Sequence, residues 1–198
     1  CATASATAGI GLNVAVITNN DKVTASVGEN GEINVSAGNV NITAESDLDA
    51  WSITVAAAIK TSGGTGSGAT IGGGLTVIVS ENEVLALLGD NSVIYASGNV
   101  TVSAANDAYL LLVSASVAAD ASGGSGVAAG GTVAVVVTGN KAKALLGDYV
   151  EITSGGDVTV SSANIEKLIS ILLSASGASG SGNAVAGTIN VLVTNSQS

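Results

Sequence analysis

The sequence predicts an all-β chain that folds as a parallel β-solenoid (β-helix) built from repeats of about 58 residues. The first observation is a near word-for-word echo: the segment ALLGD at 86–90 returns at 144–148, and 144 − 86 = 58. The second is that the same offset carries GNV at 98–100 to GDV at 156–158. The third is a composition rich in glycine and small or β-branched residues, with no proline. A fixed period indicates a repeat architecture, and coils stacked about 4.8 Å apart favour small side chains and exclude proline from the ladder.

Each repeat is expected to begin with an alternating strand. The clearest copy is GNVTVSAAND at 98–107, and similar segments begin at positions 38 and 156. Val100 and Val102 fall on one face of this strand, because side chains alternate between the two faces. That face is expected to be core.

A longer apolar strand follows, AYLLLVSASVA at 108–118. Its alternate apolar positions are expected to point inward and to form the same face in all three copies. These positions are Leu111, Val113, Ala115 and Val117, matched by Ile53, Val55, Ala57 and Ile59, and by Ile169, Ile171, Leu173 and Ala175.

A helix is the competing prediction for this segment and for IEKLISILLSASGA at 165–178. Leucine and alanine favour helices, and Asn106 or Asn164 could cap them. Against a helix stand the period-two matches across copies, the serine and valine content, and the lack of a charged face. The sequence therefore favours strands here.

Glycine-rich connectors and a second apolar strand complete the repeat. The connectors are SGGTGSGATIGGG, ASGGSGVAAGG and GASGSGNAVAG, and the strand recurs as GLNVAVIT, GLTVIVS, TVAVVVT and TINVLVT. Polar turns rich in asparagine, the ALLGD segment and a last strand such as YVEITSG follow. The near-halving of the repeat at the connector leaves two interpretations open, one wide coil for each whole repeat or two coils of half that length.

We expect the chain to be a single repeat array. Its parts are a partial unit at 1–37, units at 38–97 and 98–155, and a partial unit at 156–198. The chain has no methionine, and its first residue falls inside a repeat unit, which favours a fragment or a processed product. Cys1 is its only cysteine, so no internal disulfide can form; a lipid-modified N-terminal cysteine is an alternative to a plain one.

The charge pattern restricts the partners. Fifteen acidic residues against five lysines give a net charge of −10. Nucleic acid and anionic membrane are therefore electrostatically disfavoured as partners. No uninterrupted apolar stretch is long enough to predict a membrane-spanning helix.

Acidic side chains are the candidates for a bound metal. Asp47 and Asp49 lie in the segment ESDLD, and Asp90 and Asp148 end the two ALLGD segments. Carboxylate oxygens suit calcium, so the four could bind it weakly, although solvated turn carboxylates are the default interpretation. The glycine-rich segments at 63–67 and 123–127 lack the aspartate of a calcium-binding solenoid and the lysine of a phosphate loop. No cofactor is expected.

Catalysis has few candidate residues. The chain contains no histidine and no arginine. Glu81 and Glu83 could serve a glycosidase as paired acids, but their turn location and poor recurrence argue against it. We expect that the protein is not an enzyme.

Two surface features admit other functions. A column of outward hydroxyl side chains is expected, with Thr101 above Thr159 and Ser103 above Ser161. It resembles the flat hydroxyl arrays of ice-binding solenoids, although Asn41 interrupts the column. The aromatic residues, which could contact glycans, are Trp51, Tyr95, Tyr109 and Tyr149. The repeat offset aligns Trp51, Tyr109 and Lys167, so stacking between coils is the first expectation for the two aromatic residues.

From about residue 9 to residue 194, the chain resembles the repeats of large bacterial surface adhesins. The resemblance lies in the order of its segments, which is LGD, an alternating strand, GGDVTVSS, an apolar strand, a glycine–alanine run and GGTVAVVVT. These adhesins are the filamentous haemagglutinin-like and autotransporter-passenger-like proteins. The resemblance implies an extracellular, cell-surface β-solenoid segment that serves as a stalk or adhesin repeat, with a host surface or a glycan as a possible target. It implies no shared ligand residues. The alternative function is a self-assembling filament subunit, whose identical copies stack head to tail through uncapped coil ends.

Overall fold

The computed structural model describes residues 2–5, 8–61 and 68–198. Within these ranges every regular element is a strand. The strands are β1 (Ala2–Ser5), β2 (Ala8–Asn19), β3 (Lys22–Val27), β4 (Glu32–Val35), β5 (Val40–Lys60), β6 (Ala69–Ser80), β7 (Glu83–Leu88), β8 (Val93–Ala96), β9 (Val100–Asp120), β10 (Val127–Thr138), β11 (Lys141–Leu146), β12 (Glu151–Ser154), β13 (Val158–Ala178) and β14 (Asn183–Thr194). The strand prediction is confirmed for both segments in which a helix competed.

The strands form four parallel sheets, and the chain visits them in a fixed order before it returns beside itself. The sheet orders are β1-β5-β9-β13, β14-β10-β6-β2, β11-β7-β3 and β12-β8-β4. Glu83 pairs with Lys141, an offset of 141 − 83 = 58. Ala8 pairs with Ala69, an offset of 69 − 8 = 61. One circuit therefore takes a whole repeat of the sequence, which agrees with the wide coil rather than with two short ones.

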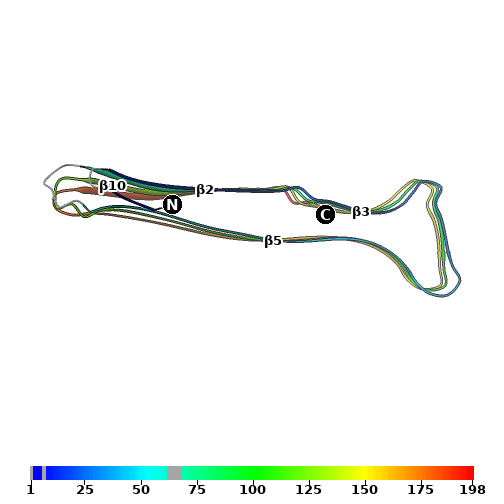
Figure 1. The fold of residues 1–198 in the computed structure, drawn as a ribbon. Helices are drawn as coiled ribbons and strands as arrows, with labels where there is room; N and C mark the ends of the chain where they lie inside the picture. The colour runs from blue at the N-terminus through cyan, green and yellow to red at the C-terminus, as the bar shows by residue number, and fades with distance from the viewer. Residues whose placement is uncertain (1, 6–7, 62–67) are drawn as a thin grey trace.

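The circuits stack into a long, narrow body (Figure 1). Two long layers, one of β5, β9 and β13 and the other of β2, β6, β10 and β14, run beside each other. The short sheets lie at the right of the view, where the body widens, and the glycine-rich turns at 121–126 and 179–182 lie at the narrow left end. This parallel, stacked arrangement is compatible with a β-solenoid.

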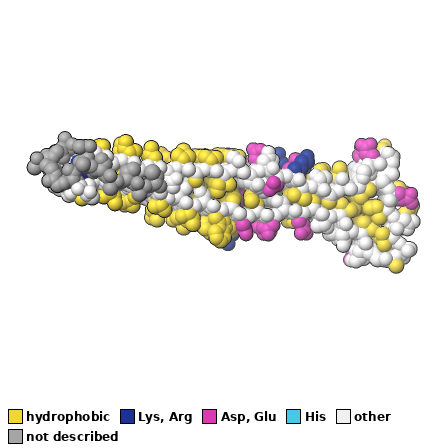
Figure 2. Space-filling model, viewed as in Figure 1, with side chains coloured by type: hydrophobic (Ala, Val, Ile, Leu, Met, Phe, Trp, Pro, Cys, Tyr) yellow, Lys and Arg dark blue, Asp and Glu magenta, His cyan; other side chains and the backbone are white. Residues whose placement is uncertain are grey.

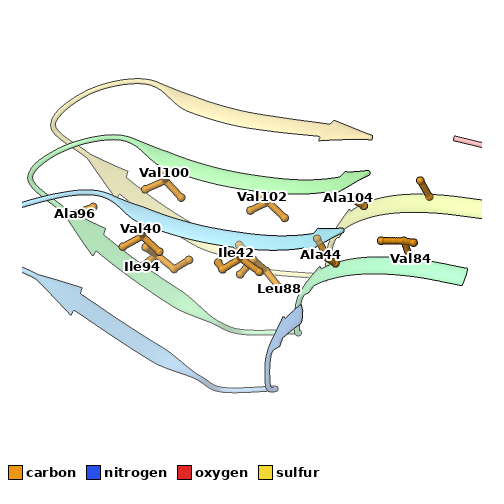
Figure 3. Close-up of a cluster of buried hydrophobic side chains, with 12 residues drawn as sticks. Val40, Ile42, Ala44, Val84, Leu88, Ile94, Ala96, Val100, Val102 and Ala104 are labelled. Carbon is orange, nitrogen blue, oxygen red and sulfur yellow. The ribbon is translucent and has the colours of Figure 1, made fainter. Parts of the chain in front are cut away.

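An aliphatic core fills the wide end, where three sheets surround it (Figure 3). Val100 and Val102 are fully buried there, as the sequence predicts. The residues around them are Val40, Ile42, Ala44, Val84, Ala86, Leu88, Ile94, Ala96, Ala104 and Ala142. A second cluster, comprising Ala50, Ile78, Leu110, Leu112, Ala134 and Val136, lies farther along between the long layers.

The predicted inward face of the second half of the long strand is wrong. β9 is one continuous strand of 21 residues. The phase set by Val100 and Val102 therefore carries on to Leu110 and Leu112, which are fully buried, and turns Leu111 outward. The other residues of that predicted inward face also occupy outward positions. They are Val113, Ala115, Val117, Ile53, Val55, Ala57, Ile59, Ile169, Ile171, Leu173 and Ala175.

The physical reason is the narrow space between the long layers near the connectors. A Cβ atom at the inward-facing Gly72 would lie 2.6 Å from the carbonyl oxygen of Val117 in the opposite layer. Apart from Lys60 and Asp120 at its far end, the inward positions of this stretch carry small residues such as Gly72, Ala118 and Ser116. Ser114 and Ser116 are therefore buried, while Ile53 is 68% exposed.

The predicted alignment of Trp51 with Tyr109 is also wrong. Trp51 pairs with Leu111, and Asp49 pairs with Tyr109, because β5 and β9 are offset by 100 − 40 = 60 rather than by 58. Trp51 is 65% exposed and does not stack on Tyr109. The second half of the alignment is confirmed: Tyr109 pairs with Lys167, whose ammonium lies 5.6 Å from the ring centroid.

Candidate functional site

Polar side chains occupy the interior between the long layers. Thr54 of β5 donates a hydrogen bond to Ser114 of β9 at 2.8 Å, and its hydroxyl lies 3.0 Å from that of Thr76 in the opposite layer. Asn19 donates to the side-chain oxygen of Asn82 at 2.8 Å, one circuit away. These contacts join neighbouring circuits and the two layers, so these polar side chains hold the strands together.

A buried ion pair lies at the connector end of the same interior. Lys60 of β5 and Asp120 of β9 pair in register, with 3.6 Å between the ammonium nitrogen and a carboxylate oxygen. Their side chains are 2% and 1% exposed. Ser122 completes the group: its hydroxyl and backbone N–H donate to Asp120, and it accepts a hydrogen bond from Lys60 at 3.2 Å.

Hydrogen bonding lowers the pKa of Asp120 below its ordinary value of 3.8, chiefly through the Ser122 hydroxyl. Desolvation acts in the opposite direction, and the Ser122 N–H and the Lys60 charge add to the lowering. A carboxylate whose pKa is lowered in the fold contributes stability that is fully present above its unfolded pKa. That contribution is lost as the pH falls from 3.8 through the lower folded value.

We expect Asp120→Ala to lower the melting temperature by several degrees at pH 7, because it leaves the Lys60 ammonium buried without its partner. The double variant Lys60→Met/Asp120→Leu removes both charges and should regain most of the loss. Circular dichroism melts at pH 7 and below pH 3.8 provide the measurement, and the difference from wild type should shrink at the acidic pH. An equal deficit at both pH values would contradict the role assigned to the carboxylate.

The four aspartates predicted as calcium ligands do not come together. Asp90 and Asp148 stack in the turns after β7 and β11, where an Asp90 carboxylate oxygen accepts the backbone N–H of Asp148 at 2.8 Å. Asp47 and Asp49 lie on β5, in a different sheet, beside Asp107 and Tyr109 of β9. In the described ranges no group of three or more acidic, cysteine or histidine side chains could hold a metal ion. Weak calcium binding stays a prediction.

The remaining candidates are placed as follows. Glu83 forms an exposed ion pair with Lys22 at 3.4 Å, which gives it a structural partner. Thr101 and Ser103 stand in register with Thr159 and Ser161, and Asn41 lies beside Thr101. Cys1 and the connector segment 62–67 lie outside the described residues. No helix in the described part of the chain is long and apolar enough to cross a membrane.

The most distinctive surface is apolar and lies over the narrow half of the body. Figure 2 shows hydrophobic side chains along both outlines of that half, while acidic and lysine side chains begin near the middle. On the layer of β2, β6, β10 and β14, outward positions between Ala69 and Val79 and between Val127 and Val137 carry no charge. Monomeric proteins rarely expose large continuous apolar patches unless the patch has a partner.

A groove crosses this apolar face from circuit to circuit. Its floor includes the outward-facing Gly73 of β6 and Gly131 of β10, and Gly187 continues their column in register on β14. Its volume is about 500 Å³, and Leu75 and Val133 are among its walls. Leu12 of β2 occupies the same column in the first circuit, where it stands as a ridge that is 58% exposed.

The outward glycines of this column differ from their inward neighbours. A Cβ atom at Gly130 would lie 2.7 Å from the carbonyl oxygen of Ala175, so close packing requires glycine there. A Cβ atom at Gly187 would meet nothing within 4 Å, and at Gly131 the nearest atom would be 3.6 Å away. The fold itself therefore does not need glycine at 131 and 187, whereas a Cβ atom at Gly73 would lie 2.8 Å from the Leu12 side chain. Sequence reasoning treated the glycine runs as connectors and missed the column, although pairing IGG at 71–73 with AGG at 129–131 would have revealed it.

Comparisons with known proteins add no relative to this picture. No protein-family model matches the chain, and neither a curated protein nor a solved structure matches it. The similarity to adhesin repeats stays an expectation from the sequence.

Proposed function

We propose that the chain is a β-solenoid segment of an extracellular bacterial surface protein, and that it acts as a rigid stalk or adhesin repeat rather than as an enzyme. The parallel ladders support this proposal, because each circuit hydrogen-bonds to the next over most of its length. Every additional circuit lengthens such a body by about 4.8 Å without changing its cross-section. Reach and stiffness then follow from the number of circuits.

One observation carries the proposal: core positions are uncovered in the last circuit. Val136 is fully buried, whereas Leu192, its register partner on β14, is 53% exposed. Val158 and Val160 of β13 are 49% and 43% exposed, although their partners Val100 and Val102 are fully buried. A further circuit stacked on β13 and β14 would bury these side chains, as happens between neighbours in repeat proteins.

Tandem duplication tests the stalk function. A chain in which residues 98–155 are repeated in frame after position 155 should fold with one more circuit. It should show a higher free energy of unfolding and a larger urea m-value, because more surface is buried per chain. The control carries the same inserted segment in shuffled order at the same place. Equal stability and equal m-values for the duplicated chain and the control would rule out circuit-by-circuit stacking.

The same uncovered side chains favour the second candidate function, a filament subunit whose copies stack head to tail. In that case the isolated chain should sediment as a concentration-dependent series of oligomers. Leu192→Lys, which places a charge on the end of the stack, should abolish the series. A chain that remains monomeric at high concentration would eliminate the filament function and leave the stalk function intact.

The cell-surface location and an adhesive target are parts of the proposal that rest on the sequence resemblance. A net charge of −10 supports partners other than nucleic acid. A host surface or a glycan remains the proposed class of target.

A further inference from the structure

We propose that a second copy of this chain docks on the apolar face formed by β2, β6, β10 and β14, so that two bodies pair side by side. This lateral contact goes beyond the stacking of circuits, because it uses outward side chains rather than the end of the ladder. The occupant is argued from the area of the face, its shape and its charges.

The area is close to what a stable dimer needs. Four strands about 4.8 Å apart and eleven residues of about 3.3 Å each give a face of roughly 700 Å². A standard protein interface buries about 800 Å² per partner. The face also has the usual anatomy of an interface, since an apolar centre is bordered by charged residues such as Lys22 and Glu83.

The shape of the face is complementary to itself. Consider two copies that face each other across a two-fold axis parallel to the strands. The axis reverses the order of circuits in the second copy and places each column of one copy opposite the same column of the other. Leu12 in the first circuit would then face Gly187 in the last circuit of the partner copy, and the reverse contact would form as well. The ridge of each copy fills the open end of the other copy's glycine groove.

The neighbouring columns agree with this arrangement. In the adjoining column the large Ile71 would face the small Ala129. At the border, Glu83 and Lys141, which are register partners within one copy, would face each other across the interface and form two unlike pairs. In this orientation Ile71 and Ala129 match in size and Glu83 and Lys141 match in charge, while Ile10 would face Val185 as a contact between two large apolar side chains.

Lipid is the less favoured occupant. The sheet ends at β14, on which no further strand pairs among the described residues. Immersion in hydrocarbon would leave the outer backbone groups of that strand without hydrogen bonds, at a cost of several kcal/mol for each group. A face-to-face pair leaves the same edge in water.

The test is sedimentation equilibrium in a Leu192→Lys background, which removes association through the end of the stack. We expect a monomer–dimer equilibrium. Leu12→Gly and Gly187→Leu should each weaken it roughly tenfold or more, because one removes the ridge and the other fills the groove. The double swap Leu12→Gly/Gly187→Leu should restore dimers, since ridge and groove then exchange places.

Matched controls separate this contact from general stickiness. Val135→Glu, on the docking face, should abolish the dimer, whereas Val113→Glu, at an equally half-buried outward position of the other layer, should leave it intact. Circular dichroism and urea melts verify that each variant is folded. A monomeric parent, or a Gly187→Leu variant that dimerises as strongly as the parent, would overturn the proposal. Flotation with neutral phosphatidylcholine vesicles in place of dimerisation would assign the face to lipid and would also overturn it.

Discussion

Replacing Gly130 with valine is expected to destabilise the protein by about 3 kcal/mol or more, the upper range for overpacking a closely packed interior. Even the first carbon of the new side chain would lie 2.7 Å from the carbonyl oxygen of Ala175 in the opposite layer. That oxygen belongs to the backbone of a paired strand, so the layers must separate or the ladder must break. Urea unfolding followed by circular dichroism measures the effect.

The adjacent residue provides the control. Gly131→Val changes the same residue type to the same side chain on the same strand, but its Cβ would be 3.6 Å from the nearest atom. Valine suits a strand better than glycine does, so we expect Gly131→Val to be neutral or stabilising, measured at a chain concentration too low for pairing. Equal losses at Gly130 and Gly131 would mean that the two glycines do not face opposite sides.

Leu110→Ala is expected to cost about 2–5 kcal/mol, the range for removing a fully buried leucine side chain and leaving a cavity. Leu110 packs with Leu112, Ile78 and Val136 between the long layers. Leu111→Ala is the matched control, because that leucine is next in sequence and points outward, and it should cost clearly less. Free energies from urea titration decide between them, and a larger loss for Leu111→Ala would restore the face that the sequence predicts and the structure contradicts.

Much of the architecture could be predicted from the sequence. The ALLGD echo locates two strands that pair in register, Ala86 with Ala144, at the offset it defines. The four copies of the second apolar strand, one of which contains TVAVVVT, pair with one another as a single sheet in the structure. Both predictions succeed because stacked circuits of similar length place residues about one sequence period apart beside each other.

The site could be predicted only in part. The buried pair of Lys60 and Asp120 escapes a search at the ALLGD offset, because β5 and β9 pair at the slightly longer offset of 120 − 60 = 60. The glycine column could have been predicted from the sequence, but the open space above Gly131 could not. Whether a glycine is required by contact or left open depends on atoms from the opposite layer, as the difference between Gly130 and Gly131 demonstrates.

The sequence by itself therefore determined the strands and their parallel order, since these follow from a local alternation and a repeat distance. It left open whether one circuit takes a whole repeat or half of one, and the strand pairing decided that. Only the tertiary structure decided which face of the long strands is buried. Alternation defines two faces without saying which one is inside. The distance between the layers makes that choice. Near the wide end there is room for Val100 and Leu110, whereas positions such as Gly130 leave no room for a larger side chain, so the larger apolar side chains there turn outward.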